Sequence, residues 1–423
     1  MSLLSIVFLL GYSIIILERH LRVEKAASAL LLGCALWAII ALTGTDGHDL
    51  LPGLGAHLSE IAAIVFFLLG AMTIVEVIDE HDAFDILTSR IRTKSLRSLL
   101  WIVSFLSFFL SAFLDNLTAT IVMLAITQKL VADKKPRLIF AGMIVIAANS
   151  GGAFSPIGDV TTTMLWIGER VSALRIIARL FLPSLVSLLI PLLIVTFSMK
   201  GGAAETPAAA KAEDGATPTE RAAILAIGLA LLVGVPFFKL ATGLPPYLGI
   251  LFALGILWLV TEIMHRDKPE HVRTRLGPAS AFTEIDLPTL LFFIGILLAV
   301  AALETAGTLA HVSSWLNATM GNQNLIVVIL GFLSSIVDNV PLVSAAMGMF
   351  GIDQFPMDHR LWELLAFCAG TGGSMLIIGS AAGIAAMGIE RISFGWYLKR
   401  ITPLAVIGYL AGVAVYLGFA DAF

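Results

Sequence analysis

The sequence predicts an all-α protein that crosses a membrane several times and contains two similar halves of opposite orientation. Three observations predict this fold class. Of the 423 residues, 58% are hydrophobic and 13% are charged, with a mean hydropathy of +0.95, whereas soluble domains carry about 25% charged residues. An Asp-Asn pair inside apolar sequence occurs twice. Glycine-rich interruptions of apolar segments also occur twice.

The two pairs are Asp115-Asn116 and Asp338-Asn339, one in each half of the chain. An ionised carboxylate at the centre of a bilayer costs at least about 2.5 kcal/mol, so such a residue is by default a functional candidate. Helix capping is the alternative role of either aspartate. Serine or asparagine would cap a helix without a charge, and we therefore place both pairs in the candidate site.

Apolar segments at residues 3–17, 26–42 and 61–78 predict helices of an N-terminal scaffold region, residues 1–97. Lysine and arginine follow the first and third segments and are absent from the loop between the second and third. The positive-inside rule then predicts a periplasmic N-terminus. The first segment lacks a basic start and a cleavage site, which favours a retained helix over a signal peptide.

Residues 98–131 predict a re-entrant hairpin, in which two apolar arms of about 16 residues meet at Asp115-Asn116. Each arm would be roughly 24 Å long, shorter than a hydrocarbon core of about 30 Å. Basic residues flank both outer ends, so both ends are expected at the cytoplasmic face: Lys94, Arg97, Lys134, Lys135 and Arg137. The Asp-Asn pair would then lie at the buried tip.

A helix broken in its middle is predicted for residues 138–167, with the interruption at 149–159. Three glycines and a proline cannot continue a helix there: Gly151, Gly152, Gly158 and Pro156. The freed backbone groups must face protein or a water-filled cavity, and such breaks form ion sites in secondary transporters. An interfacial helix (169–179) and a spanning helix (180–197) complete a first transport repeat, residues 98–199.

The second half repeats this order. Residues 200–221, rich in Ala, Pro, Glu and Gly, predict a flexible linker, and residues 222–303 a second scaffold region. Residues 304–423 form the second transport repeat, with a hairpin at 325–350 and a helix at 361–389 that is broken at Gly372, Gly373 and Gly379. Residues 304–324 contain no lysine or arginine, so this hairpin is expected to enter from outside.

Matches between the halves continue outside the Asp-Asn pairs. Gly151-Gly152 matches Gly372-Gly373, Gly158 matches Gly379, and Glu169-Arg170 matches Glu390-Arg391, all with the same separation along the chain. A run of matches at nearly constant separation indicates an internal repeat. Because the two hairpins are expected to enter from opposite faces, the repeat is predicted to be inverted.

Leu-Asp-Asn-Leu-Thr with Asn-Ser-Gly-Gly-Ala-Phe-Ser-Pro-Ile-Gly-Asp-Val-Thr-Thr resembles the NhaD-type bacterial sodium/proton antiporters of the ion transporter superfamily, and the second-half motifs are similar to that family's second half. The resemblance implies exchange of Na⁺ or Li⁺ for H⁺ across the bacterial inner membrane and a part in pH homeostasis. It also implies the hairpin fold shared with divalent-anion symporters, a homodimer and an elevator-like motion. Those sodium-coupled anion carriers have Ser-Asn-Thr where this chain has its Asp-Asn pairs, which favours a cation as substrate.

Sodium ions in transporters are held by side-chain oxygens and unwound backbone carbonyls. A carboxylate can hold either a proton or a cation, and each weakens the binding of the other, so one site can exchange the two ions. No resident cofactor is expected. The candidate ligands are Asp115, Asn116, Thr118, Asn149, Ser150, Ser155, Asp159 and Thr161 in the first half, and Asp338, Asn339, Thr371, Ser374 and Ser380 in the second.

Two other functional classes are alternatives to an antiporter. A sodium-coupled dicarboxylate carrier or an arsenite-type permease would need basic or neutral donors at the tips, and in the sequence no lysine or arginine lies near either tip. An enzyme or scaffold is disfavoured because no nucleophile or metal-ligand cluster accompanies the aspartates. The expected partners are small cations, protons and the bilayer, without nucleic acid. Asp159 remains either a ligand or a helix cap, since its repeat partner Ser380 caps equally well.

Overall fold

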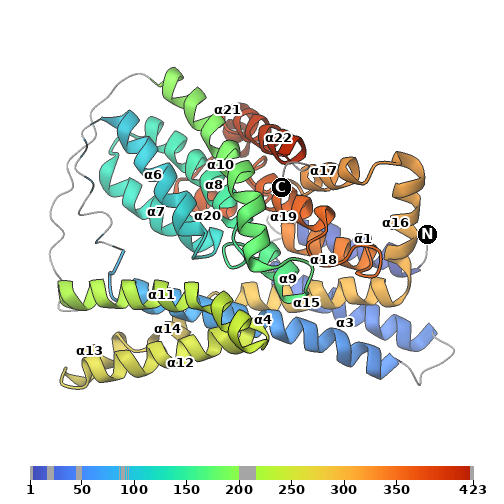
Figure 1. The fold of residues 1–423 in the computed structure, drawn as a ribbon, viewed down its shortest axis with the longest axis horizontal. Helices are drawn as coiled ribbons and strands as arrows, with labels where there is room; N and C mark the ends of the chain where they lie inside the picture. The colour runs from blue at the N-terminus through green and yellow to red at the C-terminus, as the bar shows by residue number, and fades with distance from the viewer. Residues whose placement is uncertain are drawn as a thin grey trace.

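The computed structural model describes residues 3–16, 23–43, 50–84, 86, 91, 93, 95–199 and 216–419. Its elements over these residues are α-helices (Figure 1). Eight of these helices are long and apolar enough to cross a membrane: α3 (Lys25–Thr43), α4 (Leu50–Glu80), α8 (Lys134–Ala153), α10 (Ala173–Ser198), α11 (Pro218–Thr242), α12 (Pro246–His265), α15 (Leu287–Thr305) and α22 (Thr402–Phe419). The prediction of an all-α polytopic membrane protein is confirmed.

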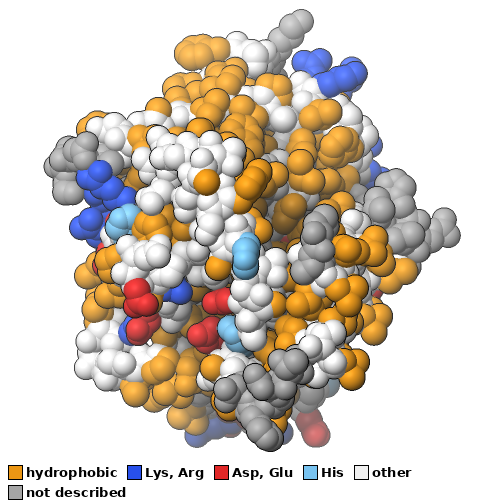
Figure 2. Space-filling model, turned by 90° about the vertical axis from the view of Figure 1, so that its right-hand side faces the viewer, with side chains coloured by type: hydrophobic (Ala, Val, Ile, Leu, Met, Phe, Trp, Pro, Cys, Tyr) orange, Lys and Arg blue, Asp and Glu red, His pale blue; other side chains and the backbone are white. Residues whose placement is uncertain are grey.

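Hydrophobic side chains are exposed over much of the surface, as the face in Figure 2 shows. Leu31 of α3 is 73% exposed and Phe197 of α10 is 83% exposed. Contiguous apolar surface of this extent marks a membrane-facing protein. These side chains therefore match the hydrocarbon rather than water.

One layer of the molecule contains α1 (Leu3–Ile16), α3, α4, α11, α12 and α15, whose long helices run across the lower part of Figure 1. Within each half, α1 packs on α3 and α11 on α12; between the halves, α15 packs on α3 and α12 on α4. Small residues permit the close crossing of α3 and α15, since a Cβ at Gly33 would overlap the Gly295 carbonyl oxygen. We call this layer the scaffold.

The second layer, the transport unit, lies above the scaffold in Figure 1. From the first half it contains α6 (Leu96–Ser111), α7 (Asn116–Leu130), α8, α9 (Val160–Ile167) and α10. From the second half it contains α17 (Gln323–Leu333), α18 (Asn339–Met349), α19 (Arg360–Gly372), α20 (Ala381–Ile389), α21 (Phe394–Arg400) and α22. Each half places a hairpin, α6–α7 or α17–α18, against a long segment, α8 or α19.

The short segments after the breaks cross between the halves. Helix α20 of the second half packs on α7 and α8, while α9 of the first half packs on α18 and α19. Helices α10 and α22 join the two halves at the periphery of the transport unit. Each hairpin therefore faces a broken-helix segment from the other half.

The glycines that we expected to break the helices act differently. Helix α8 continues through Gly151 and Gly152 to Ala153, and α19 continues to Gly372. A Cβ at Gly151 would overlap the Phe108 carbonyl oxygen, and one at Gly372 would overlap that of Gly331. These glycines let each long segment touch its own hairpin arm. The actual interruptions begin after Ala153 and after Gly372, and include Pro156, Gly158, Gly373 and Gly379.

Other expected boundaries are also corrected. The interfacial and spanning helices expected over 169–179 and 180–197 form one helix, α10. The part of the linker at 200–215 lies outside the described residues, and its last residues belong to α11, which a capping box of Thr217 and Glu220 starts. Four short helices of the described residues were not anticipated: α13 (Glu270–Arg275), α14 (Pro278–Glu284), α16 (Thr308–Met320) and α21 (Phe394–Arg400). The loop at 17–22 and Arg90, Arg92 and Lys94 lie outside the described residues as well.

Polar contacts join the ends of α4, α11 and α12 at the face predicted to be cytoplasmic. The Nε2 atoms of His81 and His265 are 2.9 Å apart, and Lys268 Nζ donates to Glu220 Oε2 at 2.7 Å. Burial is the main cause that lowers the pKa of His81, to about 4. A histidine pair beside an ion pair therefore joins these three helices at this end of the scaffold.

Candidate functional site

Four helix N-termini lie around the centre of the transport unit, and each begins with one of the predicted site residues. Asp115 accepts from Thr118 N at 2.9 Å and caps α7, and Asp338 accepts from Val340 N at 3.2 Å and caps α18. Asp159 caps α9 and Ser380 caps α20. Helix N-termini carry partial positive charge, which stabilises carboxylates placed there.

Asp159 connects the two hairpin tips. Its carboxylate, 2% exposed, accepts from Nδ2 of Asn116 at 3.3 Å and from Nδ2 of Asn339 at 3.3–3.4 Å. It also accepts from Thr161 N at 3.0 Å. A buried carboxylate needs such donors. Asp159 is therefore a helix cap and a link between the halves at the same time.

Asn149 extends this network to the second break. Its Oδ1 accepts from Asn116 Nδ2 at 3.2 Å, and its Nδ2 donates to Ser380 Oγ at 3.1 Å. A continuous set of polar contacts thus runs from Ser380 through Asn149, Asn116 and Asp159 to Asn339. Both hairpins and both breaks contribute to it.

The carboxylates of Asp115 and Asp338 lie outside this central network. Both side chains are half-buried, and Asp115 Oδ2 also accepts from Thr118 Oγ1 at 2.5 Å. Each lines a small cavity between its hairpin tip and the scaffold, with a volume of about 20 Å³ beside Asp115 and about 80 Å³ beside Asp338. A site of about 10–15 Å³ already holds one water molecule, so both cavities can hold a small ion.

The walls of the two cavities correspond through the repeat. The first contains Phe67, Asp115, Ile157 and Thr163, and the second contains Phe292, Asp338, Ile378 and Ile384 at the matching places of the other half. In each case one wall belongs to scaffold helices and the other to the hairpin tip and the broken helix. Four lining positions of each cavity, the aspartate included, are thus related by the repeat.

Four of the remaining predicted hydroxyl ligands bond within their own surroundings. Ser150 Oγ pairs with Ser187 Oγ at 2.8 Å, and Ser155 Oγ donates to the Ala112 carbonyl at 2.5 Å. Thr371 and Ser374 donate to backbone carbonyls of Phe367 and Thr371. These four hydroxyls stabilise the breaks and are not brought to the two aspartates.

Two serines that the sequence analysis did not single out hold the hairpins in place. Ser111 Oγ donates to the Ala148 carbonyl at 2.7 Å, and its repeat counterpart Ser334 donates to the Ala369 carbonyl at 2.8 Å. Gly158 approaches the Ser111 carbonyl, and Gly379 approaches that of Ser335, closely enough that a Cβ would overlap either. Each tip is therefore fixed against its own broken helix.

A larger cavity of about 680 Å³ lies between scaffold helices α4, α12 and α15 and the transport helices α9 and α18. Glu60, Glu304, His57 and Arg170 line it among apolar residues. It lies at the face predicted to be outside and reaches the helices that begin at Asp159 and Asp338. Clefts lined by acidic groups concentrate cations.

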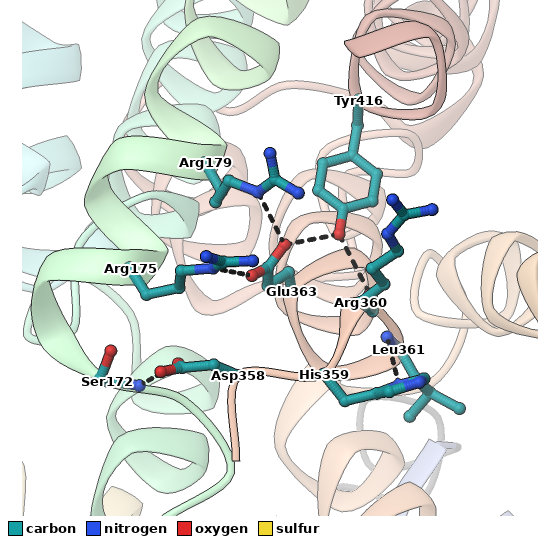
Figure 3. A network of polar contacts seen from close by, with 9 residues as sticks. All are labelled: Ser172, Arg175, Arg179, Asp358, His359, Arg360, Leu361, Glu363 and Tyr416. Atoms are coloured by element: carbon teal, nitrogen blue, oxygen red, sulfur yellow. Dashed lines mark hydrogen bonds and ion pairs between the residues drawn. The ribbon is translucent and has the colours of Figure 1, made fainter. Parts of the chain in front are cut away.

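Charged residues also meet in the transport unit, at the face predicted to be outside (Figure 3). Glu363 of α19, fully buried, accepts from Arg175 Nε at 2.9 Å, from Arg179 Nε at 3.4 Å and from Tyr416 Oη at 2.7 Å. Both arginines lie in α10, and Arg175 and Arg179 fall in the stretch that was expected to be an interfacial helix, 169–179, for which no partner was predicted. Their position follows from this buried carboxylate.

Glu363→Ala is expected to lower the thermal stability of the purified protein strongly. Removing one partner from a buried ion pair costs about 3–5 kcal/mol, because the other charge remains buried. Arg175→Gln should cost much less, since the Arg175 side chain is 43% exposed and Arg179 stays paired. Thermal unfolding in detergent, followed by intrinsic fluorescence, measures both; equal shifts would contradict this assignment.

The fold and these contacts define a polytopic membrane transporter in which two hairpin tips meet two broken helices. The family model described as "Citrate transporter" matches residues 12–362. Sodium/proton antiporters 1 and 2 of Arabidopsis thaliana are 46% and 42% identical to this chain over 98% of it, covering 72% and 98% of those proteins. The Na⁺/H⁺ antiporter NhaD of Alkalimonas amylolytica is 34% identical over 97% of this chain and 89% of its own length.

The chain belongs to the NhaD-type sodium/proton antiporters, a family of the ion transporter superfamily. Among solved structures, the Alcanivorax borkumensis YdaH transporter matches 94% of this chain and 99% of its own, with a TM-score of 0.59 and 14% sequence identity. This likeness concerns the fold alone.

Proposed function

We propose that the protein is a secondary antiporter that exchanges Na⁺ or Li⁺ for H⁺, and that the ions compete for Asp115 and Asp338. The observation that carries the proposal is the duplicated cavity, in which each aspartate faces a space of ion size between its tip and the scaffold. Membership of the NhaD-type family supports the choice of ions.

The cap geometry prepares each aspartate for this exchange. The backbone N–H groups that bond Asp115 and Asp338 fix one oxygen of each carboxylate at a helix N-terminus, where negative charge is stabilised. A cation that enters the cavity binds this charge, and a proton removes it. Because either ion excludes the other, release of one permits the binding of the next.

The central network supplies the link between the two aspartates in this proposal. Asp159 accepts a hydrogen bond from the asparagine that follows each aspartate, so a shift of one tip would displace the other through Asp159. The cavities lie between the scaffold and the transport unit, which is where an elevator-like movement would open them to one face and then the other. That movement, a homodimer and a bacterial inner-membrane location stay predictions.

The inverted orientation of the two halves is part of the proposal. The packing of α9 on α18 and α19 of the second half, and of α20 on α7 and α8 of the first half, supports it. In a variant in which Cys34 and Cys368 are replaced by alanine, Lys134→Cys and Gln323→Cys should react with a membrane-impermeant maleimide from opposite faces. These residues are the first residues of α8 and α17. Reaction of both from one face would refute the inversion.

A sodium-coupled carrier of a carboxylate such as citrate is the second candidate, because the matching family model bears that description. Proteoliposomes with an imposed pH gradient separate the two. Added Na⁺ or Li⁺ should collapse the gradient, while K⁺ and citrate should not. Citrate-dependent Na⁺ uptake without proton release would replace our proposal by the carrier.

A further inference from the structure

The cavity beside Asp338 contains a lysine that the sequence analysis did not connect with it. Lys25, the first residue of α3, is half-buried, and its Nζ lies 4.7 Å from the centre of the Phe292 ring. Lys25, Phe292, Tyr12 and Asp338 line the same cavity of about 80 Å³. No lysine or arginine lies near the second tip in the sequence, but the fold brings Lys25 to the cavity that this tip lines.

The repeat-related cavity differs on this point. Phe67 occupies the place of Phe292, and none of the described residues that line the cavity beside Asp115 is a lysine or an arginine. Lys239 is the comparable scaffold lysine of that side. Its Nζ lies 5.4 Å from the Trp166 ring and donates to the Trp166 carbonyl at 3.4 Å, and it does not line either aspartate cavity.

The apolar surroundings favour an ion pair between Lys25 and Asp338. The other lining residues are aliphatic apart from Phe292 and Tyr12: Ile15, Ile16, Ile336, Ile378 and Ile384. Opposite charges attract far more strongly in such surroundings than in water. The lysine side chain is a flexible four-carbon stem with a mobile charged end, and Asp338 is the one acidic residue among the described residues of this cavity wall.

We propose that Lys25 is a tethered cation that neutralises Asp338 in the sodium-free protein and competes with Na⁺ for it. Asp115 then binds Na⁺ against protons alone, whereas Asp338 binds it against protons and Lys25. Lys25 belongs to the scaffold and Asp338 to the transport unit, so their pairing holds the second tip against α1, α3 and α15. Na⁺ at Asp338 releases this contact. This inference rests on the proposed function, since it assumes that Asp338 binds Na⁺.

The test is the binding of radioactive Na⁺ to the purified full-length protein at one alkaline pH. Lys25→Gln should lower the apparent Na⁺ dissociation constant about threefold to tenfold, because the competing charge is gone. Lys25→Arg, which keeps the charge, should change it little. The matched control, Lys239→Gln, removes a ring-stacked scaffold lysine outside the cavities and should leave the constant unchanged. If Lys25→Gln cannot be purified, Lys25→Met makes the same test.

The aspartate variants identify where Lys25 acts. The effect of Lys25→Gln should persist in Asp115→Asn and disappear in Asp338→Asn. An unchanged constant in Lys25→Gln, or an equal shift in both aspartate backgrounds, overturns the inference. Failure of the proposed function has a different signature: wild-type protein would then show no Na⁺ binding that protons displace.

Discussion

Asp115→Asn and Asp338→Asn are each expected to reduce Na⁺-driven proton flux about 100-fold or more while the protein remains inserted and folded. A carboxylate and a monovalent cation 4 Å apart attract by about 4 kcal/mol at an effective dielectric constant of about 20, and the amide has neither the charge nor the proton site. Asparagine is as good a helix cap as aspartate, so α7 and α18 keep their N-terminal hydrogen bonds. The measurement is the quenching of a pH-sensitive dye in proteoliposomes.

Asp286→Asn is the matched control for these variants. Asp286 caps α15 as Asp115 caps α7: it accepts from Thr289 N at 3.2 Å and from Thr289 Oγ1 at 2.5 Å. It does not line either aspartate cavity, so its variant should retain most of the flux. If Asp115→Asn or Asp338→Asn also retained near-wild-type flux, that aspartate would be a cap and nothing more.

Hydropathy and repetition were sufficient to predict the class of the protein. A helix in a bilayer must pair its own backbone polar groups and expose apolar side chains. A membrane span can therefore be recognised from a short stretch of sequence alone. The two Asp-Asn tips could be found for the same reason, because a charge in such a span is conspicuous. The constant separation of the matching residues also predicted that the two halves are repeats of each other, without knowledge of any contact.

Contacts between distant residues could not be predicted in this way. Lys25 and Asp338 are 313 residues apart in the sequence, and only the packing of α3 and α15 beside the second hairpin brings them to one cavity. Glu363 did carry a local signal, since it is a charge within the apolar start of α19. Its partners Arg175 and Arg179 lie in the other half of the chain, and neither segment contains a sequence pattern that predicts the pairing.

Asp159 illustrates a choice that sequence alone left open. Capping and ion binding both require an acceptor at the start of α9, so the local sequence is the same for either role. In the structure Asp159 caps α9 by accepting from Thr161 N, and it also accepts from the side chains of both hairpin asparagines. The glycines were misread for a related reason, because glycine serves both helix breaks and close helix contacts.

Competition between the two ions predicts how the apparent Na⁺ constant depends on pH. Lowering the pH should raise the constant, because protons occupy the aspartates that Na⁺ must bind, and saturating Na⁺ should restore the rate. In the acidic range, where the carboxyls are mostly protonated, the constant should rise by up to about tenfold per pH unit for each proton displaced, or about 1.4 kcal/mol per unit. In the alkaline range the slope should flatten, because no proton remains to be displaced.

The same measurement on variants separates the two aspartates. Lys25→Gln should lower the alkaline plateau while leaving the acidic slope in place, since it removes the tethered competitor and keeps both carboxyls. Li⁺ should give the same acidic slope as Na⁺, because the slope counts protons and not the identity of the cation. A constant that stays flat across the whole active pH range would mean that H⁺ and Na⁺ use different groups. Exchange at shared aspartates would then be excluded, whatever the effect of the Asp→Asn variants.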